Sequence, residues 1–479
     1  YSLTLDNIDS PNLSIGLDQI GNNDENGLIT PGETFEGDFS TTGSGSEEIG
    51  ELAMQADTQS GVPADTLTLN NPLDITNSAD IDLSTTSATT FSQPISAGGN
   101  ISIFSDGSLN IGGNITSQNG GIDLESPLWG LSSTNSSSTI VSSVSVTGNL
   151  SALNNTVNIG GTSSGANASD VTLDGSIQAA EVNIVAQSAI NDTSTINVTA
   201  PSGSSNISDG AVSLSTQDGP INVDGPISAT GGIQIENSGS SGAIDISGVA
   251  LSGGSGGIDV QNYGGAVSIA SSANLAATSG AISVESDGGL SVGSDSNIQS
   301  ASYISLENNK KGAITIGSGS NLQASSYVSL KNKYNSVSFS SNVTVGTGTK
   351  GFNINAGSVS FNTGFSLSDD NGGSIVANTI SLAGDDSLPA EILDADLSVD
   401  GENTIGSFNS ATLSFAAGSG LSLDSGTSTL TTTSSLSSAL TGTPALDFAA
   451  PIAVGGGSSQ PESLVINDGY SGDTVDFDK

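Results

Sequence analysis

The sequence predicts an all-β chain whose central segment winds as a parallel, right-handed β-solenoid (β-helix), with coils of about 22–25 residues and smaller irregular β regions at both ends. Three observations lead to this prediction. Short units of the form apolar-x-apolar recur at a nearly constant spacing. Gly, Asn and Ser, which favour tight turns, separate these units. No Pro lies between Pro226 and Pro389, so every backbone donor needed for strand pairing is present there.

The repeats are clearest between about residues 210 and 372. Successive lines begin with an apolar unit, and their steps are 24, 22, 24 and 24 residues, counted from Ile258 to Ile282, Ile304, Val328 and Phe352. Each unit places two side chains on one face of a short strand and the polar residue between them on the other. Every line has a second unit, at Val267/Ile269, Leu290/Val292, Ile314/Ile316, Val337/Phe339 and Val359/Phe361.

Three short strands per line form one coil, and stacked coils bury apolar faces that a single coil would expose. The alignment therefore predicts inward columns, one made of Ile282, Ile304 and Val328 and another made of Leu290, Ile314 and Val337. A third unit begins with Asn in most lines, and these residues are expected to form a side-chain ladder, at Asn274, Asn297, Asn321 and Asn342.

The same pattern, read along the chain, predicts three regions. Residues 1–62 form an N-terminal β region with a calcium-type loop. Residues 63–388 form the solenoid, in which looser spacing of 21–30 residues indicates inserted loops, above all at about 128–150. Residues 389–479 form a C-terminal β and loop region that is a candidate cap or subunit-contact segment.

Composition excludes several classes of function. The chain has 479 residues and a net charge of −43, from 49 acidic residues against six Lys, with no His and no Cys. Without these residues there is no Ser-His-Asp triad, no thiolate nucleophile and no disulfide. Nucleic acid is excluded as a partner because its phosphates need Lys or Arg for neutralisation. No apolar stretch is long enough to span a membrane.

The location is expected to be extracellular or at the cell surface. A strongly acidic chain stays soluble in salt-rich water and attracts divalent cations. The chain begins Tyr1-Ser2-Leu3 without Met, which we interpret as a secreted chain whose signal peptide has been removed, or as a fragment of a longer chain.

A calcium site is predicted near the N-terminus. The stretch from Asn22 to Glu33 follows the twelve-residue loop D-x-[DN]-x-[DN]-G-x5-E, with Asn in place of the first Asp. The predicted ligands are the side chains of Asn22, Asp24 and Asn26, the Leu28 carbonyl and both carboxylate oxygens of Glu33. The alternative is an Asn- and Gly-rich turn followed by an incidental Glu.

Positive charge is concentrated in one interval, since five of the six Lys are Lys310, Lys311, Lys331, Lys333 and Lys350. The coil alignment places Lys310 and Lys333 in the same turn, one coil apart, and aligns Glu307 with Lys331. One interpretation is pairing with carboxylates of the same chain, and each such surface pair is worth little. The other is a basic patch that docks an acidic patch of a neighbouring copy. The sequence leaves both open.

Paired carboxylates are the remaining candidates for catalysis in this chain. Asp245 and Asp259 are expected at comparable outward positions on neighbouring lines, where a pair could hydrolyse glycosides. Aromatic residues, which commonly support sugar sites, make up 4% of the chain, so we expect no enzyme activity. Acidic clusters at Asp369-Asp370 and Asp385-Asp386 could bind divalent cations or form a solvated face.

The Gly-(Ala/Gly)-Ile-x-Val lines over about residues 97–380 resemble the repeats of filamentous-haemagglutinin-like and autotransporter-type β-helix proteins of bacterial surfaces. The resemblance implies an exported surface or adhesive structure. The leading hypothesis is a secreted structural protein that self-assembles, with calcium, into an extracellular filament or surface layer, so that its partner is itself. The alternatives are an adhesin that binds glycans or a host surface, and a β-helix polysaccharide hydrolase or lyase.

Overall fold

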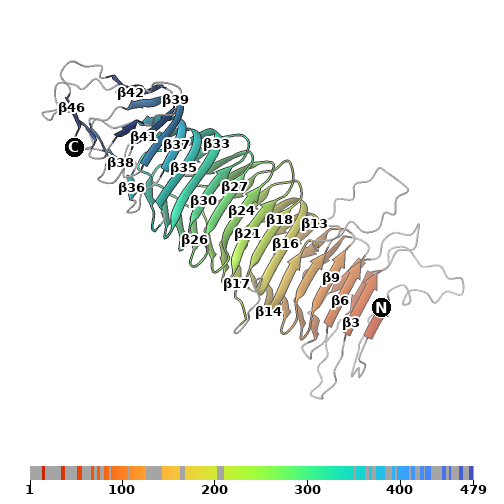
Figure 1. Ribbon diagram of the computed structural model, residues 1–479. Helices are drawn as coiled ribbons and strands as arrows, with labels where there is room; N and C mark the ends of the chain where they lie inside the picture. Colours follow the sequence, from red (N-terminus) through yellow and green to blue (C-terminus); the bar gives the residue numbers. More distant parts are fainter. Residues whose placement is uncertain are drawn as a thin grey trace, which may run out of the picture. The chain divides into compact units, whose positions relative to one another are not determined.

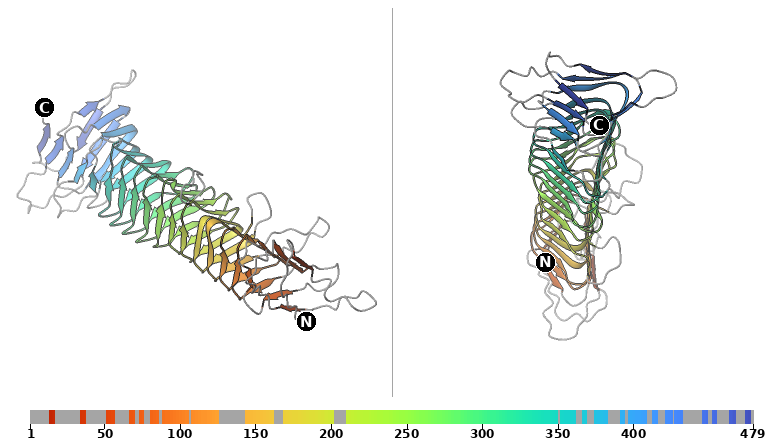
Figure 2. Two further views of the ribbon diagram at one scale, coloured as in Figure 1. Left: turned by 90° about the horizontal axis from the view of Figure 1, so that it is seen from below. Right: turned by 60° about the vertical axis from the view of Figure 1, so that its left-hand side comes forward.

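The computed structural model describes residues 88–361 except 106, 126–142, 162–167, 202–209 and 350, together with residues 73 and 80–83 and the backbone of further strands on either side. The described chain is all-β, contains no α-helix, and forms parallel β-solenoids, as the sequence predicts. It divides into two compact units, Tyr1–Gly242 (unit 1) and Ala243–Lys479 (unit 2). In each unit, strands of successive coils lie side by side (Figures 1 and 2).

Each coil of unit 2 contributes one strand to each of three faces, A, B and C, in chain order. Long strands turn the corner from face A to face B, so that their first and second halves lie on different faces. Face A contains β24 (Gly257–Asn262), β27 (Ile282–Ser286), β30 (Ile304–Asn308), the first halves of β33 (Tyr327–Phe339), β35 (Gly351–Phe361), β37 (Ser374–Leu382) and β39 (Asp396–Phe408), then β41 (Leu421–Ser425) and β44 (Ile452–Val454). Face B contains β22 (Ile244–Ile246), β25 (Ala266–Ile269), β28 (Gly289–Val292), β31 (Ile314–Ile316), the second halves of β33, β35, β37 and β39, then β42 (Thr427–Thr432) and β45 (Ser463–Asn467).

Face C of unit 2 is built from shorter strands. It contains β23 (Ala250–Gly253), β26 (Asn274–Ala277), β29 (Asn297–Ser300), β32 (Asn321–Ala324), β34 (Thr344–Gly346) and β36 (Ser366–Ser368). A separate parallel sheet near the C-terminus contains β38 (Glu391–Leu393), β40 (Thr412–Phe415), β43 (Ala445–Phe448) and β46 (Thr474–Phe477).

Unit 1 has three faces of its own, named in the same way. Face A contains β1 (Leu13–Gly16), β3 (Glu51–Ala56), β6 (Asp80–Thr85), β9 (Ile101–Ser105), β12 (Ile122–Glu125), the end of β14 (Leu150–Ile159), the middle of β16 (Ile177–Asp192), β18 (Val212–Thr216) and β21 (Gly232–Asn237). Face B contains β7 (Thr89–Phe91), β10 (Leu109–Ile111), β13 (Ser143–Val146), β15 (Ala168–Leu173), the end of β16 and β19 (Ile221–Val223). Face C contains β5 (Leu73–Ile75), β8 (Ile95–Ala97), β11 (Ile115–Ser117), the beginnings of β14 and β16, β17 (Ile196–Val198) and β20 (Ile227–Ala229), while β2 (Thr34–Gly37) and β4 (Thr66–Leu69) form a pair.

Strand pairing in unit 2 confirms the predicted coil alignment. Ile282 pairs with Ile304, which pairs with Val328, and all three side chains are fully buried. On face B, Leu290, Ile314 and Val337 form the second predicted column in the same way. Because side chains alternate between the two sides of a strand, a slip of one residue would expose a whole column, so the pattern fixes the register.

The predicted Asn ladder is confirmed for three of its four members. Asn297 Nδ2 donates to Asn274 Oδ1 at 2.8 Å, and Asn321 Nδ2 donates to Asn297 Oδ1 at 3.0 Å. The inclusion of Asn342 was wrong, because Asn321 pairs with Thr344. Asn342 instead lies in the preceding turn with a φ of 59°.

This turn has the same form before β26, β29, β32 and β34. Ser272, Asp295, Gly319 and Asn342 all have positive φ, and each precedes the first residue of its face C strand by two positions. Asn is one of the few residues that tolerate this left-handed conformation. The same residue type therefore suits both the turn and the ladder, which explains why the sequence alone did not separate them.

Coil lengths vary more in unit 1. Ile101 pairs with Ile122 after 21 residues, and Ile122 pairs with Val157 after 35 residues. The longer coil contains residues 126–142, which lie outside the described part of the chain. The strands β13 and β14 reach into the range 128–150, where an inserted loop was expected.

Candidate functional site

The corner between faces A and B of unit 2 carries most of the described Lys side chains. Four successive turns there follow a buried polar residue at the end of the face A segment, namely Asn262, Ser286, Asn308 and Asn332. Strand pairing stops where the chain turns, so some backbone donors and acceptors lose their partners there. These side chains form hydrogen bonds with those backbone groups instead. Asn308, for example, donates to the Lys311 carbonyl at 2.9 Å and accepts from the Lys310 backbone at 3.2 Å. The buried amide thus fixes the turn that presents both lysines.

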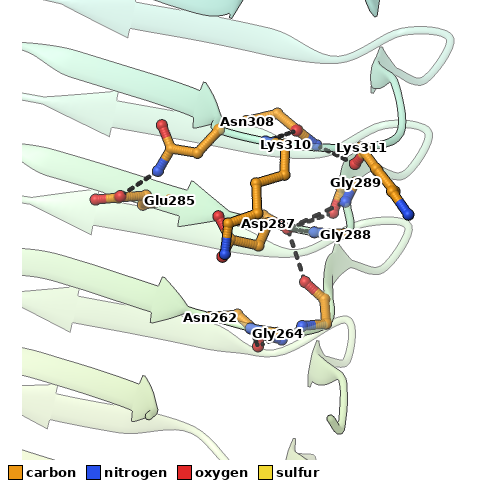
Figure 3. A network of polar contacts seen from close by, with 12 residues as sticks. Asn262, Gly264, Glu285, Asp287, Gly288, Gly289, Asn308, Lys310 and Lys311 are labelled. Atoms are coloured by element: carbon orange, nitrogen blue, oxygen red, sulfur yellow. Dashed lines mark hydrogen bonds and ion pairs between the residues drawn. The ribbon is translucent and has the colours of Figure 1, made fainter. Parts of the chain in front are cut away.

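Two lysines pair with carboxylates one coil away. Lys310 Nζ lies 2.6 Å from Asp287 Oδ2, and the two side chains are 68% and 9% exposed (Figure 3). Lys331 Nζ lies 3.2 Å from Glu307 Oε2, and strand pairing aligns these two residues as predicted. Both pairs are open to solvent on the lysine side, so each contributes little stability.

Two other lysines are exposed at the same corner. Lys311 follows Lys310 in its turn, and Lys333 lies in the next coil, 5.7 Å from the centre of the Tyr334 ring. Neither forms an ion pair with a described residue. Tyr334 is itself 70% exposed. We call Lys310, Lys311, Lys333 and Tyr334 the lysine corner.

Acidic side chains lie beside this corner on face A. Glu285 and Glu307 point outward in one column, directly paired along the strands, and Lys331 continues it. Asn309 donates to Glu285 across one coil. The corner therefore presents ammonium groups that can bind carboxylates of another molecule. The acidic side chains of the neighbouring face A would repel such carboxylates. The corner offers charge recognition and no nucleophile paired with a base.

The other predicted site residues have different outcomes. Asn22, Asp24, Asn26, Leu28 and Glu33 of the calcium loop lie outside the described residues. Lys350 and the clusters Asp369-Asp370 and Asp385-Asp386 also lie outside them. In the part of the chain that the structure describes, no three acidic side chains gather closely enough to hold a metal ion.

The predicted alignment of Asp245 with Asp259 was wrong. Asp245 lies on face B and pairs with Ser268, whereas Asp259 lies on face A and pairs with Ser283. The two residues are 14 positions apart, which is less than one coil. They therefore lie on different faces and are not aligned along the stack.

Two polar features were missed by the sequence reading. One is the buried corner column, whose signal was an Asn or Ser two residues after the apolar-x-apolar unit of four successive face A strands, β24, β27, β30 and β33. The other is Asp192, which is fully buried in unit 1 between Leu173 and Val223 of the neighbouring coils. A single Asp in an apolar column gives no repeat signal, so the alignment could not reveal it.

Comparisons with protein-family models, with curated proteins and with solved structures found no match. No helix among the described residues is long and apolar enough to cross a membrane.

Proposed function

We propose that the chain is an exported structural protein that self-associates outside the cell, of the kind represented by filamentous-haemagglutinin-like and autotransporter-type surface proteins. The main support for this proposal is that the few positive charges of the chain lie together, apart from most of its negative charges. The chain has a net charge of −43, and four of its six Lys lie within two successive coils of unit 2. In so acidic a chain, exposed ammonium groups are natural contacts for the carboxylates of another copy.

The solenoid supports the same proposal through its strand ladders. A stack of parallel coils pairs every internal strand on both sides, and a solenoid end offers unpaired donors and acceptors to another chain. Contacts that join different surfaces of two copies, and do not close into a ring, produce open polymers.

Neutralising the lysine corner is expected to weaken self-association. The triple substitution Lys310→Gln, Lys311→Gln and Lys333→Gln removes three positive charges and leaves the buried Asn308 and Asn332 in place. Light scattering at matched concentration should fall several-fold relative to the parent chain. The parent's own scattering should decline as salt rises, because the Debye length shortens from about 8 Å at 0.15 M to about 3 Å at 1 M.

A charge-matched variant separates the corner from net charge. Ser268→Glu, Ser291→Glu and Thr315→Glu on face B change the net charge by the same three units. This variant should scatter like the parent. Equal scattering by the parent and the triple Gln variant would show that the lysines serve their own chain alone, and the proposed contact would be abandoned.

We also propose that calcium binds the loop from Asn22 to Glu33 and supports assembly from there. The sequence pattern supports this proposal, since it supplies the six to eight hard oxygen ligands that calcium prefers. Glu33→Gln should lower calcium affinity at least tenfold in isothermal titration calorimetry, because the bidentate carboxylate is lost. Glu36→Gln, just beyond the loop, is the control. Equal calcium affinity of the two variants would argue against this loop.

A further inference from the structure

The two units differ in the sign of the charges they carry. Unit 1 contains more than half of the 49 acidic residues and no Lys, whereas all six Lys belong to unit 2. The chain has no Arg and no His, so the carboxylates of unit 1 have no basic side chain of their own unit as a partner. When two copies associate, favourable charge contacts therefore join unit 1 of one copy to unit 2 of the other.

Face A of unit 1 presents three carboxylates within three successive coils. Asp123 and Glu125 alternate with the buried Ile122 and Leu124 on β12, so both acidic side chains lie on the outer side of this strand. Glu181 lies on the outer side of β16, two coils further along the stack. We call Asp123, Glu125 and Glu181 the acidic patch.

Amide side chains hold two of these carboxylates in place. Asn158 Nδ2 donates to Asp123 Oδ1 at 2.5 Å, and Asn183 Nδ2 donates to Asn158 Oδ1 at 3.1 Å and to Glu181 Oε1 at 3.2 Å. Burial raises the pKa of Glu125, and the nearby charge of Asp123 adds to this shift. The amides orient the acidic patch without neutralising it, so a cation from another molecule would meet acceptors that are already positioned.

We propose that the acidic patch of unit 1 binds the lysine corner of a second copy. This inference rests on the proposed self-association and names the surface that the corner contacts. Lys311 and Lys333 form no ion pair with a described residue, and Lys310 is 68% exposed although it pairs with Asp287. All three ammonium groups are therefore open to carboxylates of another molecule. Charge complementarity selects the partner surface and the orientation, because contacts between like charges are strongly disfavoured.

The spacing of the two surfaces is compatible with this contact. Coils stack at about 4.8 Å, so Lys310 and Lys333, one coil apart, and Asp123 and Glu181, two coils apart, spread their charges over about 5–10 Å along the stack. The contact joins two different surfaces of the chain, so after it forms, one copy still has its acidic patch free and the other its lysine corner. Contacts of this kind extend into open polymers unless they close a ring.

Reversal of charge on each surface tests the contact. The corner variant carries three substitutions in unit 2, Lys310→Glu, Lys311→Glu and Lys333→Glu. The patch variant carries three in unit 1, Asp123→Lys, Glu125→Lys and Glu181→Lys. Within each variant the two surfaces then have like charge, so sedimentation velocity should show assembly of either one alone beginning at a concentration at least about tenfold higher than for the parent. An equimolar mixture should assemble like the parent, because the corner of each variant then faces an oppositely charged patch on the other.

A third variant controls for net charge. Asp174→Lys, Asp218→Lys and Asp224→Lys change the net charge of unit 1 as much as the patch variant does, at exposed positions between strands. This variant should assemble alone like the parent. Circular dichroism should show the same strand content and melting temperature for all three variants. If the patch variant is unstable, Asp123→Asn with Glu125→Gln and Glu181→Gln removes the three charges without reversing them, and this variant should also assemble less readily than the parent.

The outcomes separate this contact from the proposed self-association. A parent chain that stays monomeric at all concentrations overturns the self-association, and this contact with it. If the parent assembles and the patch variant, or its uncharged form, assembles equally well alone, the acidic patch is not the partner of the corner and the self-association stands. A mixture of folded corner and patch variants that fails to assemble also overturns the pairing of these two surfaces.

Discussion

Replacing Ile304 with Asp is expected to lower the free energy of unfolding of unit 2 by at least about 4 kcal/mol. The Ile304 side chain is fully buried between Ile282 and Val328 of the neighbouring coils. The substitution removes an apolar side chain from a packed column, which alone costs about 2–5 kcal/mol, and it buries a carboxylate without a partner. Thermal unfolding followed by circular dichroism should show a clear loss of stability.

The neighbouring residue provides the control. Ser305 points to the outer side of the same strand, where it is aligned with Ser283 and Ser329. Ser305→Asp should change the free energy of unfolding by no more than about 0.5 kcal/mol, as surface substitutions usually do. If the two variants melted alike, the inward column would be assigned to the wrong residues.

The contrast between these neighbours shows why the solenoid could be predicted. Inward and outward residues alternate strictly within a strand, and the same alternation returns after each coil, so every line of sequence reports the same register. Ile258, Ile282, Ile304 and Val328 were aligned correctly because a shift by one residue would exchange apolar for polar side chains in all coils at once.

The turns could not be predicted with the same accuracy. A corner can gain or lose a residue without exposing the core, so nothing in the apolar pattern fixes its length. Asn342 was therefore placed in the ladder, although it occupies the left-handed turn before Thr344. Asp245 and Asp259 were aligned as if they were one coil apart, because both follow an Ile at the start of a strand.

The two ion-paired lysines illustrate both situations. Lys331 lies within a strand, and its pairing with Glu307 followed directly from the alignment. Lys310 lies in a turn, and its partner Asp287 could be identified from the structure alone. Lys310 and Lys331 form ion pairs within the chain, whereas Lys311 and Lys333 form none with a described residue. The proposed contact with another copy therefore uses the lysine corner as a whole.

Asp192 in unit 1 leads to a second large effect, one that depends on pH. Its side chain is fully buried at a position that Leu173 and Val223 fill in the adjacent coils. Ser194 donates to Asp192 Oδ1 from its backbone at 3.0 Å and from its hydroxyl at 2.5 Å. Oδ2 is buried and has no hydrogen-bond partner among the described residues. An ionised carboxylate is poorly compensated at such a position.

Burial raises the pKa of Asp192 from its ordinary value of 3.8 to about 6. The hydrogen bonds from Ser194 partly oppose this shift, and the charge of Asp224 adds to it. Because the folded state holds the proton more tightly than the unfolded state, stability is lost as pH rises from about 4 to about 6, and the loss persists above that range. A shift of about two pKa units corresponds to about 3 kcal/mol. Asp192→Asn keeps the shape and does not titrate, so its stability should exceed that of the parent at pH 7 by about this amount and match it near pH 4.

The measurement is hydrogen exchange of the amides around Asp192 in the parent and in the variant at each pH. Both chains share all other carboxylates, so the difference between them reports the effect of Asp192 alone. The surface variant Asp218→Asn removes one negative charge from an exposed turn of the same unit and should follow the parent at every pH. A parent and an Asp192→Asn variant that lose protection in parallel between pH 4 and pH 7 would show that Asp192 is ionised at no cost in the folded chain. If the protection of the two chains differs only as pH rises through this interval, and the change is half complete between the unfolded and the folded pKa of Asp192, the buried carboxyl is the titrating group.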